Sequence, residues 1–478
     1  MKLRLLTAFS AVLLAGTQVW AQGTVDRTKP PELGPPPRVS LPPIVTRQLA
    51  NGLKLMIVEQ HELPLADFVL IVGSGGTSDP AGKTGVANLT ASMLREGTTT
   101  RKSKDIAEQA DTMGTTLAAG SGLANFTSTI TSSGLVENFD QALGLFSDVI
   151  LHPTFPQEEI DKFKARQLQQ LQFQRSIPQF LAQERFVRAI YGNHPAGMIT
   201  APPDSLRKIT SADLAGFYAK YYRPNNSMLA IVGDVKLKEI MPKLEAAFGS
   251  WAKGDVPATS IPSVQAPGAM GIQLINRPGS VQTVLQLGNL GIERTNPDYF
   301  AVAVMNEILG GGPQARLFMN LREDKGYTYG AYSSFGGSKY RGTVVSTSEV
   351  RTDVTEGAMK EFMYELNRIR DEKVSATDLE NAKRSLVGGF ALSLEQPTAL
   401  LSNLVIQKLY DMPADYWDTY PAKVMAVTTD DVQRVAQKYV DMGHLQIVAV
   451  GDATKTRSIL AKYGSVQEYD ADGKPVKN

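Results

Sequence analysis

A glycine-rich stretch in the second half of the chain places a guanidinium and a phenol where both could hold one peptide group. Residues 309–332 read LGGGPQARLFMNLREDKGYTYGAY, and the three glycines let the backbone approach a ligand closely. Arg322 stands seven residues before Tyr329. If a short helix over 315–321 ends near Arg322 and Tyr329 starts the next strand, both side chains could bind one carbonyl or carboxylate. Arg322 could instead pair with a neighbouring carboxylate such as Glu323, and the residue types alone leave both interpretations open.

Other patterns that could do chemistry are weak. Gly82, Lys83 and Thr84 follow a glycine cluster, but five residues separate Gly76 from Gly82, whereas a phosphate loop needs four. The sequence has no G-x-S-x-G and no cysteine, which excludes the usual nucleophile motifs. Its histidines are too far apart to form a helical zinc motif; they are His61, His152, His194 and His444.

The start of the chain is typical of a secretory signal over residues 1–21. Lys2 and Arg4 precede an apolar run over 5–16, and small residues before Gln22 provide a cleavage site. No later apolar run reaches about 18 residues, so we expect export without a membrane anchor. An exported protein without cysteine must rely on core packing alone, and a bacterial periplasm fits this best.

Composition limits the partners of the protein. The chain has 478 residues, of which 42% are hydrophobic, so it can form large cores. Removing Lys2 and Arg4 with the signal leaves 47 of the 49 basic residues against 48 acidic ones. Such a balance favours neither nucleic acid nor an anionic membrane as a partner.

An internal repeat organises the chain. Residues 209–234 match residues 427–452 at a constant offset of 218, and each copy is typical of an N-capped helix, a turn and a buried strand. Two homologous halves are therefore expected. The predicted division is a signal over 1–21, a proline-rich arm over 22–45, a first domain over 46–250, a linker over 251–268 and a second domain over 269–478.

The apolar spacing of the first half predicts a mixture of strands and helices, which indicates an α+β layered fold. The expected strands are an alternating apolar run that follows Asn51 and Gly52 within 49–60, then 66–72 and 125–131, and the expected helices cover 85–95, 104–113, 136–150, 156–174 and 178–190.

Residues 46–235 and 272–452 together resemble the M16 metallopeptidase family, which includes pitrilysin and mitochondrial processing peptidase. The resemblance implies two α+β domains of the processing-peptidase-like metallohydrolase fold. In that family, the segment matching GKTGVANLTASMLREGT carries H-x-x-E-H, whose histidines bind zinc and whose glutamate is the general base. The corresponding residues here are Asn88, Ala91 and Ser92.

The third zinc ligand of the family, a glutamate, matches Gln169, with Gln170 beside it. Asparagine, serine and glutamine are weak neutral ligands for zinc, and Ala91 cannot deprotonate a bound water. The resemblance therefore implies that this chain holds no metal cofactor. Ala118 also replaces an asparagine that usually stands on the substrate-lining strand, which puts substrate pairing in the first half in doubt.

The second half keeps what the first half lacks. In catalytic relatives an arginine and a tyrosine of the C-terminal domain bind substrate, and Arg322 and Tyr329 match this pair in order and spacing. Gly310, Gly311 and Gly312, together with Arg316, resemble the loop that helps non-catalytic subunits recognise peptides.

The resemblance thus implies a substrate-binding subunit of a heterodimeric peptidase, whose partner chain carries H-x-x-E-H and zinc. Two alternatives stay open. The chain could be a catalytically inert peptide-binding or assembly protein of the same fold, or a self-sufficient hydrolase with a different ligand set.

Overall fold

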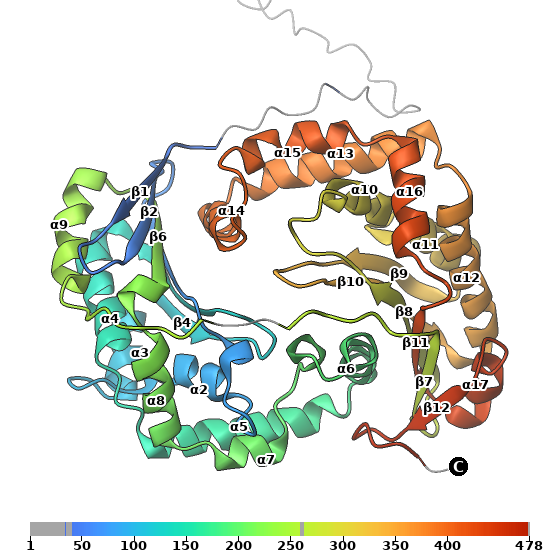
Figure 1. Ribbon diagram of the computed structural model, residues 1–478, viewed down its shortest axis with the longest axis horizontal. Helices are drawn as coiled ribbons and strands as arrows, with labels where there is room; N and C mark the ends of the chain where they lie inside the picture. The colour runs from blue at the N-terminus through green and yellow to red at the C-terminus, as the bar shows by residue number, and fades with distance from the viewer. Residues whose placement is uncertain (1–33, 35–40, 259–261, 477–478) are drawn as a thin grey trace, which may run out of the picture. The chain divides into compact units, whose positions relative to one another are not determined.

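The computed structural model describes Gly34 and residues 41–258 and 262–476. The expected signal over 1–21 and most of the arm over 22–45 lie outside the described residues. Residues Arg38–Asn478 form one compact unit of mixed helices and strands, which confirms the α+β class (Figure 1). Within the described part of the chain, no helix is both long and apolar enough to cross a membrane.

The strands form two six-stranded sheets. The order in the first sheet is β1-β2-β6-β3-β5-β4, with β1 Ile44–Gln48, β2 Lys54–Glu59, β3 Leu65–Val72, β4 Thr116–Gly120, β5 Ser128–Leu135 and β6 Ser227–Gly233. The order in the second sheet is β12-β7-β11-β8-β10-β9, with β7 Gly271–Asn276, β8 Gln282–Leu290, β9 Thr328–Phe335, β10 Thr343–Arg351, β11 Gln446–Gly451 and β12 Val466–Tyr469.

The two sheets share one topology, which confirms the repeat. β6 pairs parallel with β2 and antiparallel with β3, and β11 pairs in the same way with β7 and β8. Each of these strands follows a helix that opens with a capping box, formed by Thr210 and Asp213 in the first half and by Thr428 and Asp431 in the second. Only the outer strands differ, because β1 is antiparallel to β2 whereas β12 is parallel to β7.

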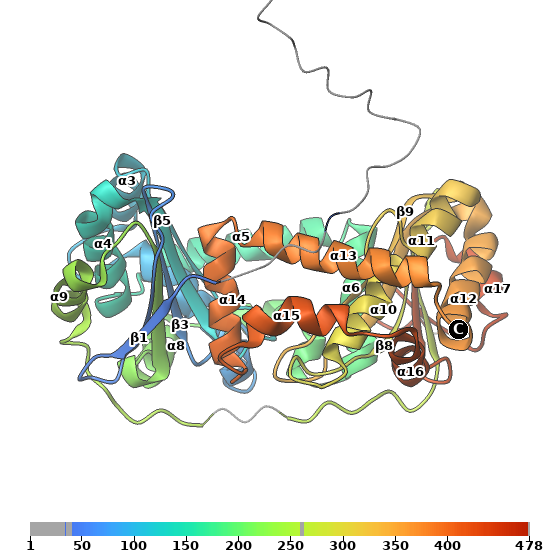
Figure 2. The same ribbon diagram turned by 90° about the horizontal axis from the view of Figure 1, so that it is seen from above.

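Helices cover both sheets (Figures 1 and 2). In the first half they are α2 Val86–Met93, α3 Ser103–Thr112, α4 Phe139–Leu151, α5 Gln157–Gln174, α6 Pro178–Tyr191, α7 Pro203–Lys208, α8 Ser211–Tyr221 and α9 Leu237–Phe248. In the second half they are α10 Tyr299–Gly310, α11 Arg316–Phe318, α12 Thr355–Asp371, α13 Ala376–Ser393, α14 Pro397–Leu409, α15 Tyr416–Met425, α16 Thr429–Tyr439 and α17 Ala453–Leu460. The predicted helices of the first half are present within a few residues of their expected ends. The strand expected over 125–131 begins later, at Ser128, because Asn125 closes a turn on Gly122.

Each half supplies one helix that packs against the sheet of the other half, and we call this the exchange of helices. α14 packs against β6 and β3 of the first sheet, while α6 packs against β11 and β8 of the second. The apolar cluster under α14 joins its leucines to first-half strand residues; it includes Met56, Val58, Ala230, Val232, Leu400, Leu401 and Leu404. The opposite side chains of the same strands, such as Leu55 and Ile57, belong to the core of the first half. Both faces of β2 are buried, so its apolar run is continuous, and the alternation expected after Asn51 and Gly52 is wrong.

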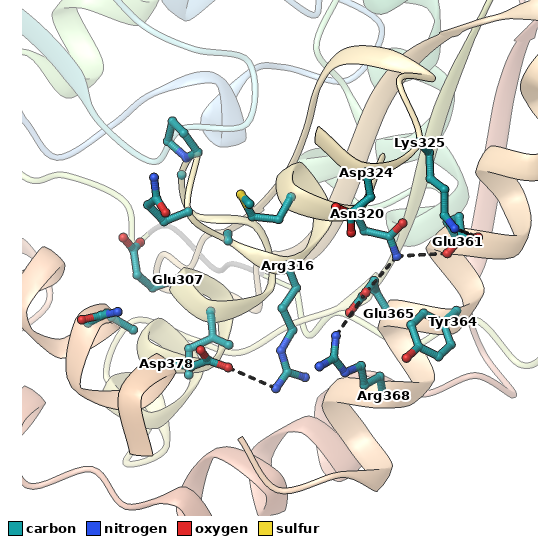
Figure 3. A pocket seen from close by; sticks show the side chains of 18 of the residues that line it. Glu307, Arg316, Asn320, Asp324, Lys325, Glu361, Tyr364, Glu365, Arg368 and Asp378 are labelled. Carbon is teal, nitrogen blue, oxygen red and sulfur yellow. Dashed lines mark hydrogen bonds and ion pairs between the residues drawn. The ribbon is translucent and has the colours of Figure 1, made fainter. Parts of the chain in front are cut away.

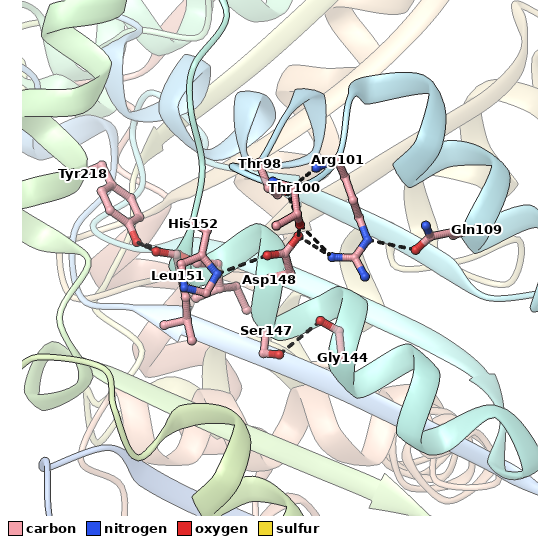
Figure 4. A network of polar contacts seen from close by, with 11 residues as sticks. Thr98, Thr100, Arg101, Gln109, Gly144, Ser147, Asp148, Leu151, His152 and Tyr218 are labelled. Atoms are coloured by element: carbon pink, nitrogen blue, oxygen red, sulfur yellow. Dashed lines mark hydrogen bonds and ion pairs between the residues drawn. The ribbon is translucent and has the colours of Figure 1, made fainter.

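Hydrogen bonds and ion pairs connect the loop that follows α2 with helix α4 (Figure 4). Arg101 Nη1 lies 2.7 Å from Asp148 Oδ2, and His152 Nδ1 lies 3.1 Å from Asp148 Oδ1. Burial alone would raise the pKa of Asp148, but hydrogen bonds from Thr98, Arg101 and His152 outweigh it and hold that pKa below its ordinary value. The carboxylate is therefore charged at neutral pH and holds the loop in place.

Asp79 fixes the start of α2. Its carboxylate accepts the backbone N–H groups of Gly85 at 2.6 Å and Ala87 at 2.7 Å, which would otherwise lack partners at the helix N-terminus. Gly85 takes a left-handed φ of 106°, a conformation that favours glycine, and this allows the chain to turn into the helix. Burial raises the pKa of Asp79 to about 6, although the two backbone hydrogen bonds act in the opposite direction.

The exchanged helix should stabilise a strand far away in the sequence. Leu401 of α14 is fully buried, so Leu401→Ala should lower the free energy of unfolding by about 2–5 kcal/mol. Urea denaturation measures this loss, and hydrogen exchange should show faster exchange in β6. The matched control is Leu392→Ala, because Leu392 is 66% exposed and its truncation should change little. Unchanged exchange in β6 would contradict the packing described here.

Asp79 should make stability depend on pH. Because its pKa is higher in the folded chain than the ordinary 3.8, the native state binds the proton more tightly. Its stabilising contribution is complete below about pH 4 and is lost as pH rises through about 6. Asp79→Asn cannot titrate, so the stability of the wild type relative to this variant should fall by about 3 kcal/mol over that window. Urea denaturation from pH 4 to 7 tests this, and a constant difference would refute it.

Candidate functional site

The positions of the absent zinc motif lie on α2. Ala91 and Ser92 are buried, and Asn88 lies at the edge of a hollow of about 210 Å³ between α2 and α5. Gln170 of α5 lines this hollow together with Asn88. Gln169, the position expected from the sequence, is the preceding residue of the same helix and is exposed.

These residues do not suit zinc. Asn88 donates its amide Nδ2–H to the carbonyl oxygen of Ser121 at 2.6 Å, so the nitrogen end of the amide is already engaged. The neighbouring glutamines are neutral, and zinc in proteins is bound by thiolates, imidazoles and carboxylates. Among the described residues, no three histidine, cysteine, aspartate or glutamate side chains are grouped to hold a metal ion. The hollow therefore lies beside the positions that match the zinc motif of the family, but it lacks side chains that bind zinc.

Arg322 lies on a short irregular helix in the second half. The helix predicted over 315–321 is present as α11 followed by a π-helical turn over Met319–Asp324, which carries Arg322 in its middle. The guanidinium lies 4.7 Å from the ring centroid of Phe318, and its Nε is 3.5 Å from Glu323 Oε1. The pairing with Glu323 that the sequence left open is thus present. Because the Arg322 side chain is 46% exposed, this contact is weak and leaves the guanidinium accessible.

A β-bulge turns Tyr329 out of the sheet. Between two regular pairs of β9 and β10, Tyr329 and Gly330 oppose the single residue Glu349. The bulge is held by Thr328, which donates to the Glu349 carbonyl at 2.6 Å, and by Ser348, which donates to the Gly330 carbonyl at 2.9 Å. Tyr329 is consequently 90% exposed. Bulges commonly re-aim a side chain in this way.

The turn between these residues is short and hydrogen-bonded. Gly326 N–H donates to the carbonyl of Arg322 at 3.0 Å, and Tyr327 N–H donates to that of Leu321 at 2.9 Å. Tyr332 lies on the same strand as Tyr329, and its ring centroid is 5.5 Å from that of Phe318. Arg322 and Tyr329 are thus two exposed polar side chains on consecutive elements at an edge of the second sheet.

The three glycines have different surroundings. A Cβ at Gly310 would lie 2.2 Å from the backbone nitrogen of Ser333, and one at Gly311 would lie 2.7 Å from the Cα of Glu307. Gly310 therefore lets α10 approach β9 closely, and Gly311 lets the loop after α10 fold back against Glu307 of the same helix. Gly312 has open space around it and lines a hollow of about 1030 Å³.

This large hollow lies between α10, α12, α13 and the π-helical turn (Figure 3). Arg316 lines it with a side chain that is only 9% exposed, and its Nη2 is 3.6 Å from Asp378 Oδ2. Its Nε and Nη1 are buried without a hydrogen-bond partner. Opposite it, Asn320 donates to Glu361 at 3.0 Å and to Glu365 at 2.9 Å. Arg322 and Tyr329 are not among the lining residues, so the structure separates Arg316 and Gly312 from that pair.

Ala118 lies on β4, the edge strand of the first sheet, where it pairs with Thr131 of β5. The other side of β4 has no strand neighbour within the described sheet. Its counterpart in the second sheet is β9, the strand that carries Tyr329. Neither the bulge in β9 nor the π-helical turn was predicted from the sequence. The closest signal was Gly330, because a glycine inside a strand often marks a bulge.

Known families and proteins resemble the chain over most of its length. Residues 55–204 match the family described as Insulinase (Peptidase family M16), and residues 208–386 match that described as Peptidase M16 inactive domain. An uncharacterized zinc protease of Rickettsia felis is 28% identical over 404 residues, which are 82% of this chain and 93% of the relative.

Solved structures agree with these matches. A peptidase M16 inactive domain from Pseudomonas fluorescens is 30% identical with a TM-score of 0.79, and the similarity covers 86% of this chain and 98% of that one. The periplasmic protease PqqL from Escherichia coli shares the fold with a TM-score of 0.73 and 16% identity, over 88% of this chain and 50% of that one. The two-sheet fold, the repeat and these similarities together establish that the chain belongs to the M16 peptidase family.

Proposed function

We propose that this chain is the non-catalytic, substrate-binding subunit of a heterodimeric periplasmic zinc metallopeptidase. A partner chain of the same family with H-x-x-E-H supplies the zinc ion and the general base. This chain supplies Arg322 and Tyr329 to the peptide at the shared active site.

The exposure of Tyr329 carries the proposal. A phenol that is 90% exposed on a bulge, on the strand that follows the half-exposed Arg322, has no packing role that would explain its position. The described part of the chain has no cluster of metal-binding side chains to serve these groups, since Asn88, Ala91, Ser92 and the adjacent glutamines of α5 are neutral. Two accessible donors without a complementary base are what one half of a divided active site would present.

The chemistry of the pair suits a scissile carbonyl. As the carbonyl carbon becomes tetrahedral, its oxygen gains negative charge, which N–H and O–H donors can stabilise. The Arg322 guanidinium can donate N–H groups to that oxygen, and the Tyr329 hydroxyl can donate a further hydrogen bond. The Glu323 contact of Arg322 is long and solvated, so a substrate can replace it with little loss of free energy.

Gly312 and Arg316 extend the peptide site on the other side of the π-helical turn. Arg316 lines the 1030 Å³ hollow and has two unpaired donors, which could bind a backbone carbonyl or an acidic side chain of the substrate. Gly310 and Gly311 act indirectly, since their lack of a side chain lets α10 and the loop pack closely.

The descriptions of related proteins support two parts of this proposal, the peptidase chemistry and the periplasmic location. Several bacterial relatives carry the description of zinc protease, and PqqL, which shares the fold, is described as a periplasmic protease. The signal expected over residues 1–21 would bring this chain to the same compartment.

Mixing this chain with a family member that carries H-x-x-E-H should produce peptidase activity that this chain alone lacks. In the mixed complex, Arg322→Ala should lower kcat by about 10²–10³-fold, the loss typical of one oxyanion donor. Tyr329→Phe should lower kcat without preventing assembly, because only the hydroxyl is removed. Cleavage of a quenched fluorescent peptide measures both effects.

The matched control is Arg207→Ala, which removes an exposed arginine paired with Asp204 on α7 and should leave kcat unchanged. Metal analysis should find zinc in the partner and none in stoichiometric amount in this chain. Copurification without any gain of activity would instead favour an inert assembly protein. Full activity of Arg322→Ala would exclude the proposed role of that residue.

A further inference from the structure

A second hollow in the second half, whose lining includes neither Arg322 nor Tyr329, combines aromatic rings with a buried cation that has no carboxylate partner among the described residues. It has a volume of about 570 Å³ and lies where the loop before α10 meets α15 and α16. Three of its lining residues are aromatic, namely Tyr299, Phe300 and Tyr416. This volume falls within the range of small-molecule sites in proteins.

Arg294 is the buried cation. It is 8% exposed, its guanidinium carbon lies 3.7 Å from the ring centroid of Tyr299 and 5.3 Å from that of Tyr416, and its Nη1 is buried without a hydrogen-bond partner. Stacking on aromatic faces compensates part of the lost hydration of a guanidinium. It does not replace the hydrogen bonds that a buried N–H group requires.

Lys423 brings a second positive charge to the same hollow. Its Nζ lies 5.3 Å from the ring centroid of Tyr416 and 5.6 Å from that of Phe300. Among the described residues, neither Lys423 nor Arg294 has a carboxylate within ion-pair distance. The hollow thus contains two cations whose charge no neighbouring side chain neutralises directly.

The other charged groups at the hollow are already paired. Arg434 lies 2.7 Å from Asp298 Oδ1 and 3.4 Å from Asp431 Oδ1. Asp431 also accepts hydrogen bonds from Thr428 in the capping box of α16. Asp411 remains, but it is exposed and sits on a strained turn with a φ of 51°. Lys423 and Asp411 both lie at the exposed rim, so the lining has three cations, Arg294, Lys423 and Arg434, against two carboxylates, Asp411 and Asp431, which is an excess of one positive charge.

We propose that this hollow binds a small carboxylate with an aromatic or branched apolar body, either as a free acid or as the C-terminal residue of a peptide. The carboxylate accepts from Arg294 Nη1 and is attracted by Lys423. The apolar body lies against the rings of Tyr299, Phe300 and Tyr416. The inference does not depend on the proposed peptidase role, because it uses none of the same residues.

The probe is 3-phenylpropanoate, titrated into the full-length mature chain and followed by isothermal calorimetry and ligand-observed NMR. We expect saturable binding that is at least about tenfold weaker for 3-phenylpropan-1-ol, which has the same body without the charge. A tripeptide that ends in phenylalanine is tested as the free acid and as the C-terminal amide. Tight binding of the peptide acid alone would identify the peptide terminus as the natural source, and tight binding of the small acid alone would identify a metabolite.

Lys423→Met tests the charge without disturbing the buried arginine, and it should weaken binding of the acid about tenfold. The matched control is Lys220→Met, because Lys220 Nζ also lies over an aromatic ring, 5.0 Å from that of Tyr221, but outside the hollow. This control should bind like the wild type. No saturable binding of either acid, equal binding of the alcohol, or equal effects of the two lysine variants would each overturn the proposal.

Discussion

Helix α14 covers one face of β6 in the first half, and α6 covers the corresponding face of β11 in the second. The other face of each strand lies in the core of its own half, so β6 and β11 expose no side to water. Each fully buried leucine or valine contributes about 1.5–3 kcal/mol relative to exposure. Separating the halves would expose both clusters together, and neither half is expected to be stable alone. The site elements at the edge of the second sheet therefore depend on this exchange of helices, and Gln179 of α6 also donates to Glu349 Oε2, opposite the bulge, at 2.6 Å.

Much of this fold could be predicted from the sequence. The offset of 218 residues identified the two halves, and the capping boxes at Thr210 and Thr428 marked the helices that precede the central strands. The exchange of α6 and α14 could not be predicted. The apolar spacing of a helix indicates that one of its faces is buried, but it does not indicate which sheet that face packs against. The continuous apolar run of β2 did carry the information that both faces are buried.

The candidate site was predictable in its residue types but not in its geometry. Spacing placed Arg322 and Tyr329 near the ends of a helix and a strand, yet their exposure comes from a π-helical turn and a β-bulge. Both irregularities rest on local hydrogen bonds, such as those of Thr328 and Ser348, that have no periodic signature. The same limit applies to the glycines. Gly310 and Gly312 are indistinguishable in sequence, although one packs against β9 and the other lines a hollow.

The arginines of the second half differ in how easily they can change partners. Arg322 is half exposed, and its solvated contact with Glu323 is worth about 0–1 kcal/mol, so an incoming carbonyl displaces little. Arg294 and Arg316 are buried with free N–H groups, so a ligand would satisfy donors that water cannot readily reach. The first type suits an interaction that must form and break in every turnover. Buried arginines such as Arg294 and Arg316 suit a ligand or chain segment that stays bound, because its departure would leave their N–H groups without hydrogen-bond partners again.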